Sequence, residues 1–120
     1  MEFTNNKAIY LQIMDLLCEK VLKGTWEGGD KIPSVRQLAV ELEVNPNTVA
    51  RSYSSLQDDG VIYNKRGIGY FISEDATHLV KKVSKQEFMK QDAPNFFKKI
   101  NLLGISWEEL TQIYQDQFNK

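Results

Sequence analysis

The chain has 120 residues, 42% hydrophobic and 26% charged, and a formal net charge of −1. This length allows one ordinary domain or two small ones, and the composition is typical of globular proteins and not of disordered chains. A chain of this size buries too little volume for a large catalytic architecture. Its one cysteine and one histidine, Cys18 and His78, exclude an internal disulfide and leave no set of nitrogen and sulfur ligands for zinc.

The sequence carries no membrane signal. No apolar run approaches the ~20 residues that a bilayer-spanning helix needs. The first ten residues lack the basic and then apolar order of a signal peptide. We therefore expect a cytoplasmic protein that contacts no membrane and carries neither a cofactor nor a metal.

A first helix is predicted from residue 6 to Gly24, because glycine is common where helices end. Its apolar stripe, at helical spacing, consists of Ile9, Ile13, Leu16, Leu17 and Val21. Further apolar residues flank this stripe, namely Tyr10, Leu11, Met14, Cys18 and Leu22. The apolar arc thus covers more than half of the circumference. One small core does not need so wide an arc, so we expect a second contact surface, either the C-terminal segment or another subunit.

Two further helices follow closely. Ser34 and Gln37 have the spacing of a capping box, so a second helix is predicted to start at Ser34. Only three residues separate it from a third helix, in which Asn45 is a preferred N-cap and Pro46 occupies the first helical position. The third helix is predicted to end just before Gly60.

Two short strands are predicted next, over residues 61–63 and 69–72, around a turn formed by Lys65, Arg66 and Gly67. The order helix, helix, tight turn, helix and β-hairpin is that of a winged helix-turn-helix domain. The predicted fold class is therefore α+β, mostly α.

The winged domain is assigned to residues 1–75, and a helical dimerisation segment to residues 76–120. Residues 74–78 are polar and show no periodicity, so they are interpreted as a connector between the two.

Beyond the connector, two helices are predicted over residues 84–103 and 106–118, separated by a glycine that suits a helix end. Each opens with a capping box. These boxes pair Ser84 with Glu87 and Ser106 with Glu109. Because Pro94 lies inside the first of these helices, we expect a kink or a break near residues 91–93.

Large apolar side chains recur along both tail helices. From Met89 to Leu103 they fall at steps of three and four residues, which is coiled-coil spacing. Two helices cannot bury this much apolar surface alone, so we expect them to pack against a second copy of the chain. The candidate dimer-interface residues are Met89, Phe96, Ile100, Leu103, Trp107, Leu110 and Tyr114. Helices committed to a partner should enclose no small-molecule pocket, and the sequence assigns no effector.

Acidic residues are absent from two segments of the winged domain, residues 44–57 and 61–73. The whole of residues 1–75 contains eleven acidic and eight basic residues, so these gaps are local. Because a protein surface without a partner usually mixes both signs, the two segments indicate contact with an anionic molecule.

The third helix and the hairpin tip carry groups that suit DNA. Asn47 and Arg51 can form bidentate hydrogen bonds with base edges, and Thr48 can contact a thymine methyl group. Arg36 opposes the dipole of the second helix, which suggests a compensating phosphate or base edge. The candidate DNA contacts are Ser34, Arg36, Asn45, Asn47, Thr48, Arg51, Lys65, Arg66 and Gly67.

The sequence leaves simpler explanations open. Asn45 could act only as a helix cap, and Asn47, Thr48 and Arg51 could simply be solvated. Arg36 could form an ion pair with Asp30 or Glu41. The glycine of the hairpin, Gly67, satisfies the turn geometry with or without DNA.

Candidates for catalysis do not form a site. Asp58 and Asp59 are adjacent at a helix end and should point apart, which excludes a general acid and base pair. His78 has no acid or thiol at ligand spacing, and Cys18 falls on an apolar helix face. We therefore do not expect an enzyme.

Three segments resemble the DNA-binding domain of the GntR family of bacterial transcription regulators. They are IYLQI (Ile9–Ile13), GGDKIPSVRQLAVELEVNPNTVARSYSSLQDDGVI (Gly28–Ile62) and RGIGYFI (Arg66–Ile72). The tail, including LGISWEEL (Leu103–Leu110), is similar to the YtrA-type subfamily, whose short tail serves dimerisation and not metabolite binding.

The resemblance implies DNA contacts from Arg36, from residues 45–51 and from the wing at Arg66 and Gly67. The sequence departs from the family pattern at Ala50, where some members place a basic contact. It also has Gly28 where the family usually has a proline.

Two functions remain. The first is a homodimeric, sequence-specific transcription regulator, most simply a repressor, that binds a double-stranded DNA operator with an inverted repeat. The alternative is a winged-helix protein-interaction module that does not bind nucleic acid. The acid-free segments favour the first.

Overall fold

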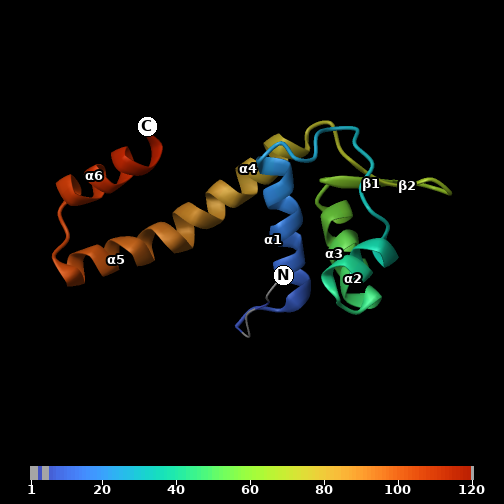
Figure 1. Cartoon of the computed structure of the whole chain (residues 1–120), viewed down its shortest axis with the longest axis horizontal. Coiled ribbons are helices and arrows are strands. Elements are labelled where there is room, and N and C mark those ends of the chain that lie inside the picture. The colour runs from blue at the N-terminus through green and yellow to red at the C-terminus, as the bar shows by residue number, and fades with distance from the viewer. Residues whose placement is uncertain (1–2, 4–5, 120) are drawn as a thin grey trace. The chain divides into compact units, whose positions relative to one another are not determined.

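The computed structural model describes residues 3 and 6–119 of the chain. Its elements are α1 (Ile9–Leu22), α2 (Val35–Leu42), α3 (Pro46–Asp58), β1 (Ile62–Lys65), β2 (Gly69–Ile72), α4 (Ala76–Glu87), the π-helical turn η1 (Phe88–Asp92), α5 (Ala93–Leu103) and α6 (Trp107–Phe118) (Figure 1). The fold is mostly helical with one two-stranded sheet, which confirms the predicted fold class. No helix in the described residues is both long and apolar enough to cross a membrane.

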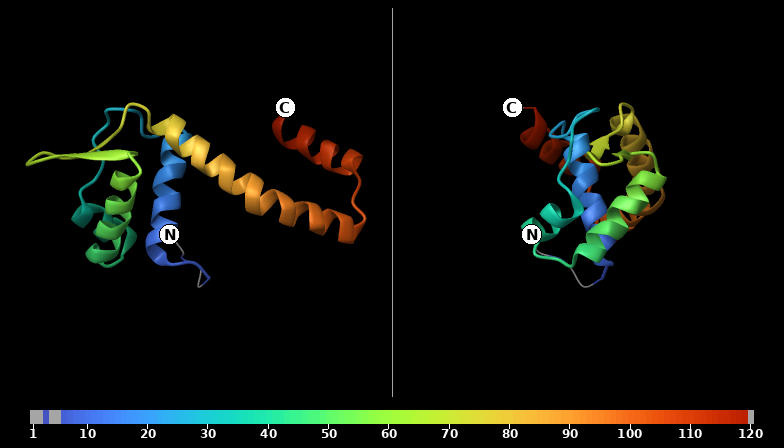
Figure 2. Two further views of the ribbon diagram at one scale, coloured as in Figure 1. Left: turned by 180° about the vertical axis from the view of Figure 1, so that it is seen from behind. Right: turned by 90° about the vertical axis from the view of Figure 1, so that its right-hand side faces the viewer.

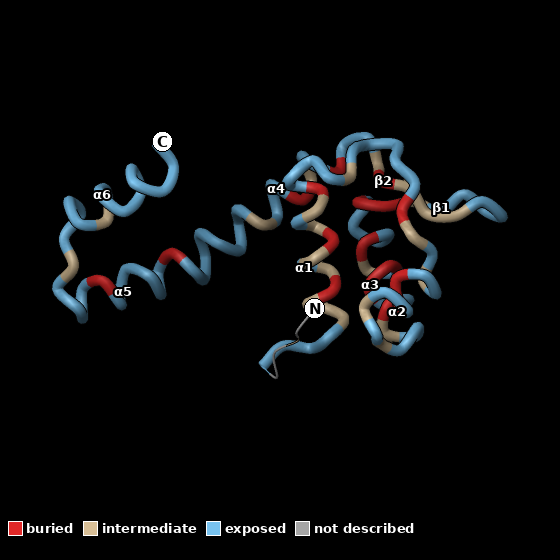
Figure 3. The backbone as a smooth tube through the Cα atoms, in the orientation of Figure 1, coloured by how far each residue is buried: buried red, intermediate tan, exposed pale blue. Residues whose placement is uncertain are grey.

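The chain divides into two compact units, residues 1–83 and residues 84–120. We call them the winged unit and the tail. In the winged unit, α1 and α2 both pack against α3, and the hairpin extends away from the end of α3 (Figure 2). The buried hydrophobic residues are Ile13, Leu17, Val21, Ile32, Leu38, Ala39, Val49, Tyr53, Leu56, Val61, Ile62, Ile72, Ala76 and Val80. Figure 3 shows the buried positions recurring along α1 and α3, as expected for amphipathic helices.

Local signals set the ends of the first three helices. The hydroxyl of Ser34 accepts a hydrogen bond from the backbone N–H of Gln37, and the Gln37 side chain accepts one from the N–H of Ser34, so the predicted capping box is confirmed. The side chain of Asn45 accepts a 2.8 Å hydrogen bond from the N–H of Asn47 and caps α3. The first helix starts later than predicted, because Ala8 is still extended, with a ψ of 139°.

The turn between α2 and α3 contains Glu43 in the left-handed conformation, with a φ of 57°. In the described part of the chain, Glu43 is the one non-glycine residue with a positive φ. This conformation stops α2 after Leu42, and Asn45 then opens α3. The tight turn of the helix-turn-helix motif therefore places Glu43 in a conformation that is sterically unfavourable for a residue with a Cβ atom.

The hairpin pairs β1 and β2 in antiparallel fashion, from Ile62 opposite Ile72 to Lys65 opposite Gly69. The predicted first strand, residues 61–63, is shifted: the N–H of Val61 instead bonds to the Leu56 carbonyl at the end of α3. As a result Lys65 belongs to the strand and not to the turn.

The connector predicted over residues 74–78 is wrong beyond its first two residues, because α4 begins at Ala76. Ala76 and Val80 are almost fully buried in the core of the winged unit, and this packing outweighs the polar local sequence. The helix also passes through Ser84 without a break, so the capping box predicted at Ser84 is not formed.

Close to Pro94, where a kink or break was expected, a π-helical turn over Phe88–Asp92 separates α4 from α5. The N–H of Ala93 reaches back five residues to the carbonyl of Phe88. The additional residue in this turn shifts the side chains before it by about 100° around the axis relative to those after it. Of the apolar row predicted from Met89 to Leu103, Ala93 and Ile100 are buried, whereas Met89, Phe96 and Leu103 are exposed.

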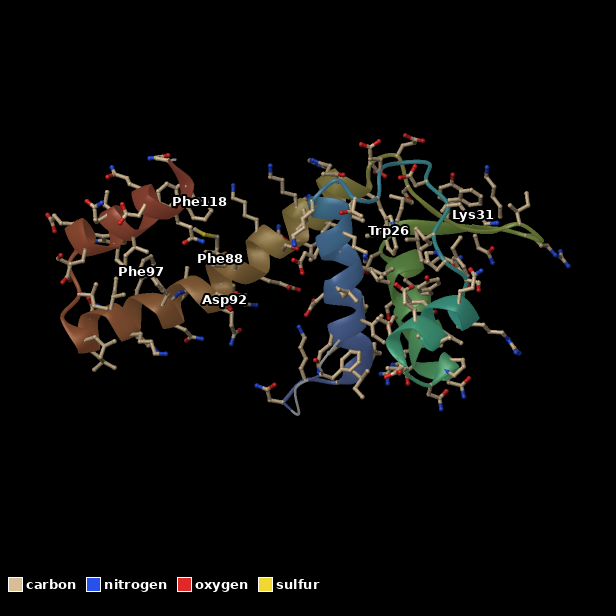
Figure 4. The ribbon with its side chains drawn as sticks, viewed as in Figure 1. Trp26, Lys31, Phe88, Asp92, Phe97 and Phe118 are labelled. Atoms are coloured by element: carbon tan, nitrogen blue, oxygen red, sulfur yellow. The ribbon has the colours of Figure 1, made fainter. Side chains whose placement is uncertain are left out.

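The remainder of the tail follows its local signals. α5 ends at Gly104, which has a φ of 65°, and the capping box of Ser106 and Glu109 opens α6 as predicted. Phe97 lies between α5 and α6 and contacts the Trp107 ring edge-on, with the ring centroids 6.0 Å apart (Figure 4).

Candidate nucleic-acid interface

Helix α3 has one buried and one exposed side. Val49, Ser52, Tyr53 and Leu56 are completely or almost completely buried and attach the helix to the winged unit. The opposite side presents mainly polar side chains. At its start, Asn47 and Arg51 are exposed and Thr48 is half-buried. The residues predicted to read base edges therefore share one surface at the first turns of α3.

Ser34 and Asn45 occupy the starts of α2 and α3, where their side-chain oxygens cap the helices. Both residues are exposed. Capping uses one acceptor of each side chain, and it leaves the Ser34 hydroxyl hydrogen and the Asn45 amide hydrogens free to donate outward.

Arg36 is exposed in the first turn of α2. The ion pairs among the described residues join Lys7 to Asp15 and Lys23 to Glu19, so Arg36 pairs with neither Asp30 nor Glu41. The intramolecular explanation for its position at a helix N-terminus is absent from the structure, and its guanidinium remains available to an anion.

The guanidinium of Arg51 stacks on an aromatic ring that, by its spacing in the sequence, belongs to the apolar arc of α1. Its Cζ atom lies 3.8 Å from the centroid of the Tyr10 ring. An open hollow of about 350 Å³ adjoins this pair, lined by Ala8, Ile9, Tyr10, Asn47, Thr48 and Arg51. The start of α1 thus belongs to the same surface as the start of α3.

Ser52 links these two helix starts. Its side chain is completely buried, and its hydroxyl lies 2.8 Å from the carbonyl oxygen of Tyr10 and 3.2 Å from that of Thr48. A serine in the middle of α3, one residue after Arg51, is the sequence signal that could have indicated this contact, but its partner is 42 residues away in the sequence.

The wing carries the remaining predicted contacts. Arg66 and Gly67 are exposed at the hairpin turn, where Gly67 has a φ of 79°. Lys65 is exposed at the end of β1, and its ammonium lies 4.6 Å from the centroid of the Phe71 ring on β2. None of these three residues lines the hollow beside Arg51.

Lys31 adds a cation to the wing that the sequence analysis missed. It forms an isolated antiparallel bridge with Phe71, so the segment before α2 pairs with the outer edge of β2. The Lys31 side chain is exposed and runs beside Gly69, where its Cε would lie 3.1 Å from an added Cβ. Three cationic residues, Lys31, Lys65 and Arg66, thus lie along the hairpin.

The electrostatic character of this surface follows from the sequence of α3 and the hairpin. Neither residues 44–57 nor residues 61–73 contain an acid, and together they include all of α3 except its last residue and the whole hairpin. Exposed arginine, asparagine and lysine groups with no acidic neighbours in sequence favour a polyanion with hydrogen-bonding edges. The described residues contain no group of three or more His, Cys, Asp or Glu side chains placed to hold a metal.

The tail presents its predicted interface residues unevenly. Met89, Phe96, Leu103, Trp107 and Tyr114 are exposed, and Leu110 is half-buried. Ile100 differs from the prediction, because it is only 8% exposed and is already covered within its own chain.

The tail also has an open apolar groove of about 570 Å³. The groove is lined by Phe96, Trp107, Leu110, Thr111, Ile113, Tyr114, Gln117 and Phe118. Phe97 of α5 contacts Trp107 of α6, and the aromatic side chains of both helices remain exposed.

Comparison with known proteins agrees with this geometry. Residues 9–72 match the family model described as bacterial regulatory proteins, gntR family. The chain is 36% identical over 111 residues to the uncharacterized HTH-type transcriptional regulator YhcF of Bacillus subtilis (strain 168), covering 92% of this chain and 90% of that one. It is 40% identical over 107 residues to the HTH-type transcriptional repressor YtrA of the same strain, covering 88% and 81%.

A solved structure of a GntR family transcriptional regulator from Listeria monocytogenes is similar along nearly the whole chain. It has a TM-score of 0.76 and 36% sequence identity, and the match covers 95% of this chain and 98% of that one. These relatives are transcription regulators and not enzymes.

Proposed function

The chain belongs to the GntR family of bacterial regulatory proteins, in its short YtrA-type form, and from this we propose that it is a repressor that binds an inverted-repeat operator as a homodimer. A bacterial transcription regulator must reach chromosomal DNA, which lies in the cytoplasm, so we place the protein there. The relative YtrA is a transcriptional repressor, which supports repression as the outcome of binding.

The observation that carries the proposal is the exposed polar start of α3. In helix-turn-helix proteins, this end of the second helix of the motif enters the major groove. Here it presents Asn47, Thr48 and Arg51, with no acid anywhere between residues 44 and 57. Arginine pairs bidentately with guanine and asparagine with adenine, so this short surface can distinguish base pairs.

The other predicted residues suit the DNA backbone. Arg36 is exposed and has no ion pair among the described residues, and Arg66 lies at the hairpin turn. Ser34 and Asn45 mark two helix N-termini, whose backbone N–H groups and dipoles favour phosphate. In this arrangement α3 supplies sequence preference, and α2 and the wing supply affinity and orientation.

We place the dimer contact in the tail. Five of its seven predicted interface residues are exposed apolar side chains, and α6 contributes most of an apolar groove. Exposed patches of this kind mark interaction surfaces. A two-fold axis through the tails would present two α3 helices to successive turns of one DNA face, hence the inverted repeat.

The proposal is tested with the full chain and DNA from its own promoter region. Affinity for this DNA, for a half-site and for random DNA is measured by fluorescence anisotropy over a salt series. We expect the promoter DNA to bind at least ~10³-fold more tightly than random DNA, and all affinities to fall steeply with salt.

The outcomes are distinct. Equal affinity for promoter and random DNA would contradict sequence-specific regulation. Absence of binding to any DNA at low salt would favour the alternative, a winged-helix module that binds protein. Equal affinity for the full site and the half-site would contradict a dimer on an inverted repeat.

A further inference from the structure

We infer that Tyr10 is a specificity-determining residue, because its ring holds the Arg51 guanidinium in the orientation in which Arg51 reads a base. This inference rests on the proposed function, since it requires α3 to enter the major groove. It extends the recognition surface to α1, outside the helix-turn-helix motif itself.

The contact between the two side chains is close. The Arg51 Cζ atom lies 3.8 Å from the centroid of the Tyr10 ring, which is stacking distance for a planar guanidinium. Tyr10 is half-buried, whereas Arg51 is exposed. The ring is therefore the fixed partner, and the arginine is the one that DNA can reach.

The backbone of Tyr10 is fixed as well. The buried hydroxyl of Ser52 lies 2.8 Å from the Tyr10 carbonyl oxygen. Ser52 is the next residue after Arg51 on α3, so the ring and the guanidinium are anchored to adjacent positions. This hydrogen bond joins α1 to α3 beside the pair.

Stacking leaves the hydrogen-bonding edges of arginine free. All five N–H donors lie in the guanidinium plane, and the ring occupies only one face of that plane. No acidic residue lies between positions 44 and 57, and Arg51 forms no ion pair with the described residues. The donors thus remain available for a guanine edge, which takes arginine in a bidentate manner.

Stacking on Tyr10 orders the Arg51 side chain before DNA binds, which should strengthen binding. A long arginine side chain loses rotamer freedom when it docks on a base, which weakens binding. A guanidinium already stacked on Tyr10 has lost part of this freedom before DNA arrives. Asn47 and Thr48 line the same hollow, so a nucleotide group entering there meets all of these side chains together.

The test uses the full-length protein and the ratio of its affinities for promoter DNA and for random DNA. Tyr10→Leu removes the ring, and we expect the ratio to fall by about three- to tenfold, from the cation–π contact and the side-chain ordering. Tyr10→Phe keeps the ring and should restore the wild-type ratio to within about twofold. Partial unfolding of a variant lowers its apparent affinity for both DNAs by the same factor, so the ratio is not affected by it.

A double-mutant cycle assigns the effect to Arg51. If the ring acts through the arginine, Tyr10→Leu should change the ratio no further once Arg51→Ala is present. Met14→Ala is the control, because Met14 lies one turn further along α1, packs against the core and does not line the hollow. Its ratio should equal that of the wild type.

Each result has one meaning. If Arg51→Ala leaves the ratio unchanged, α3 does not read DNA through Arg51, and the proposed mode of recognition fails. If Arg51→Ala lowers the ratio but Tyr10→Leu does not, only the role of Tyr10 is overturned. If Tyr10→Phe loses as much as Tyr10→Leu, the hydroxyl itself contacts DNA and the positioning role is wrong. If the losses caused by Tyr10→Leu and Arg51→Ala add up in the double variant, the ring does not act through the arginine and the positioning role is also wrong.

Discussion

The hydroxyl of Tyr53 donates a 2.6 Å hydrogen bond to the carbonyl oxygen of Pro33. Tyr53 is completely buried in the middle of α3, and Pro33 is the last residue before the cap of α2. This bond fixes the start of α2, with Arg36 in its first turn, to the helix proposed to read bases. The Tyr70 ring packs edge-on against Tyr53, with the centroids 4.9 Å apart.

Tyr53→Phe should lower the free energy of unfolding by about 1–2 kcal/mol, because it removes the donor and leaves the Pro33 carbonyl without its partner. Urea denaturation followed by circular dichroism measures this loss. Tyr63→Phe is the control, since Tyr63 is half-exposed and stacks on Phe71 in the wing. Equal stability of wild type and Tyr53→Phe would show that the bond contributes nothing.

The same hydroxyl predicts a pH dependence. Burial raises the pKa of Tyr53 well above its usual value, and Tyr70 and Glu41 add smaller contributions. Above about pH 10 the unfolded chain loses this proton while the folded chain keeps it, so stability falls as pH rises. The advantage of the wild type over Tyr53→Phe should therefore shrink between about pH 10 and 11. A constant difference over this range would contradict the prediction.

Glu43→Gly should stabilise the winged unit by about 0.5–1 kcal/mol. Glu43 has a φ of 57°, a conformation that glycine adopts without steric cost. The gain is smaller than the strain relieved, because glycine also gives the unfolded chain more freedom. Glu41→Gly is the matched control: Glu41 lies within α2, and there glycine should destabilise by about 1 kcal/mol. Thermal unfolding of both variants decides whether their effects have opposite signs.

Arg66→Ala should weaken binding to promoter and random DNA alike, because a phosphate contact carries no sequence information. The slope of log K against log salt should become less steep by about 1. Lys23→Ala removes an equal charge, but Lys23 pairs with Glu19 near the end of α1, so it should leave this slope unchanged. A loss confined to promoter DNA would assign Arg66 to base reading instead.

Ile113→Asp should give monomers whose winged unit remains folded. Ile113 is exposed and lines the apolar groove, so a carboxylate there would be buried without a partner in a dimer. Operator affinity should fall by about 10²-fold or more, while half-site affinity stays constant. Leu102→Asp is the control, because Leu102 is 86% exposed and lies outside the groove. Sedimentation of the Ile113 variant as a dimer would contradict this interface.

Elements that depend on local chemistry were predictable from the sequence. The capping boxes at Ser34 and Ser106, the N-cap at Asn45 and the helix end at Gly104 each involve residues within a few positions, and the structure confirms them. The candidate site on α3 followed from the same signals, because once the ends of a helix are known its exposed side can be listed.

Features that depend on tertiary contacts were not predictable in this way. The start of α4 at Ala76 is set by burial in a core formed mostly by earlier residues. The stacking of Arg51 on Tyr10 joins residues 41 positions apart, and in the sequence Tyr10 reads simply as part of an apolar arc. Ile100 fell on the predicted interface because the pattern did not reveal which apolar residues α5 and α6 use for themselves.

The π-helical turn over Phe88–Asp92 has a consequence for cooperativity. Pro94 has no amide hydrogen to donate to the carbonyl of Lys90, and the N–H of Ala93 bonds to Phe88, so the ladder of regular hydrogen bonds is interrupted here. Fraying that begins in α5 therefore meets a boundary before it reaches α4, whose first turns are held by the buried Ala76 and Val80. Loss of helical order in the tail can stop at this turn, and the winged unit then persists as an independently folded module.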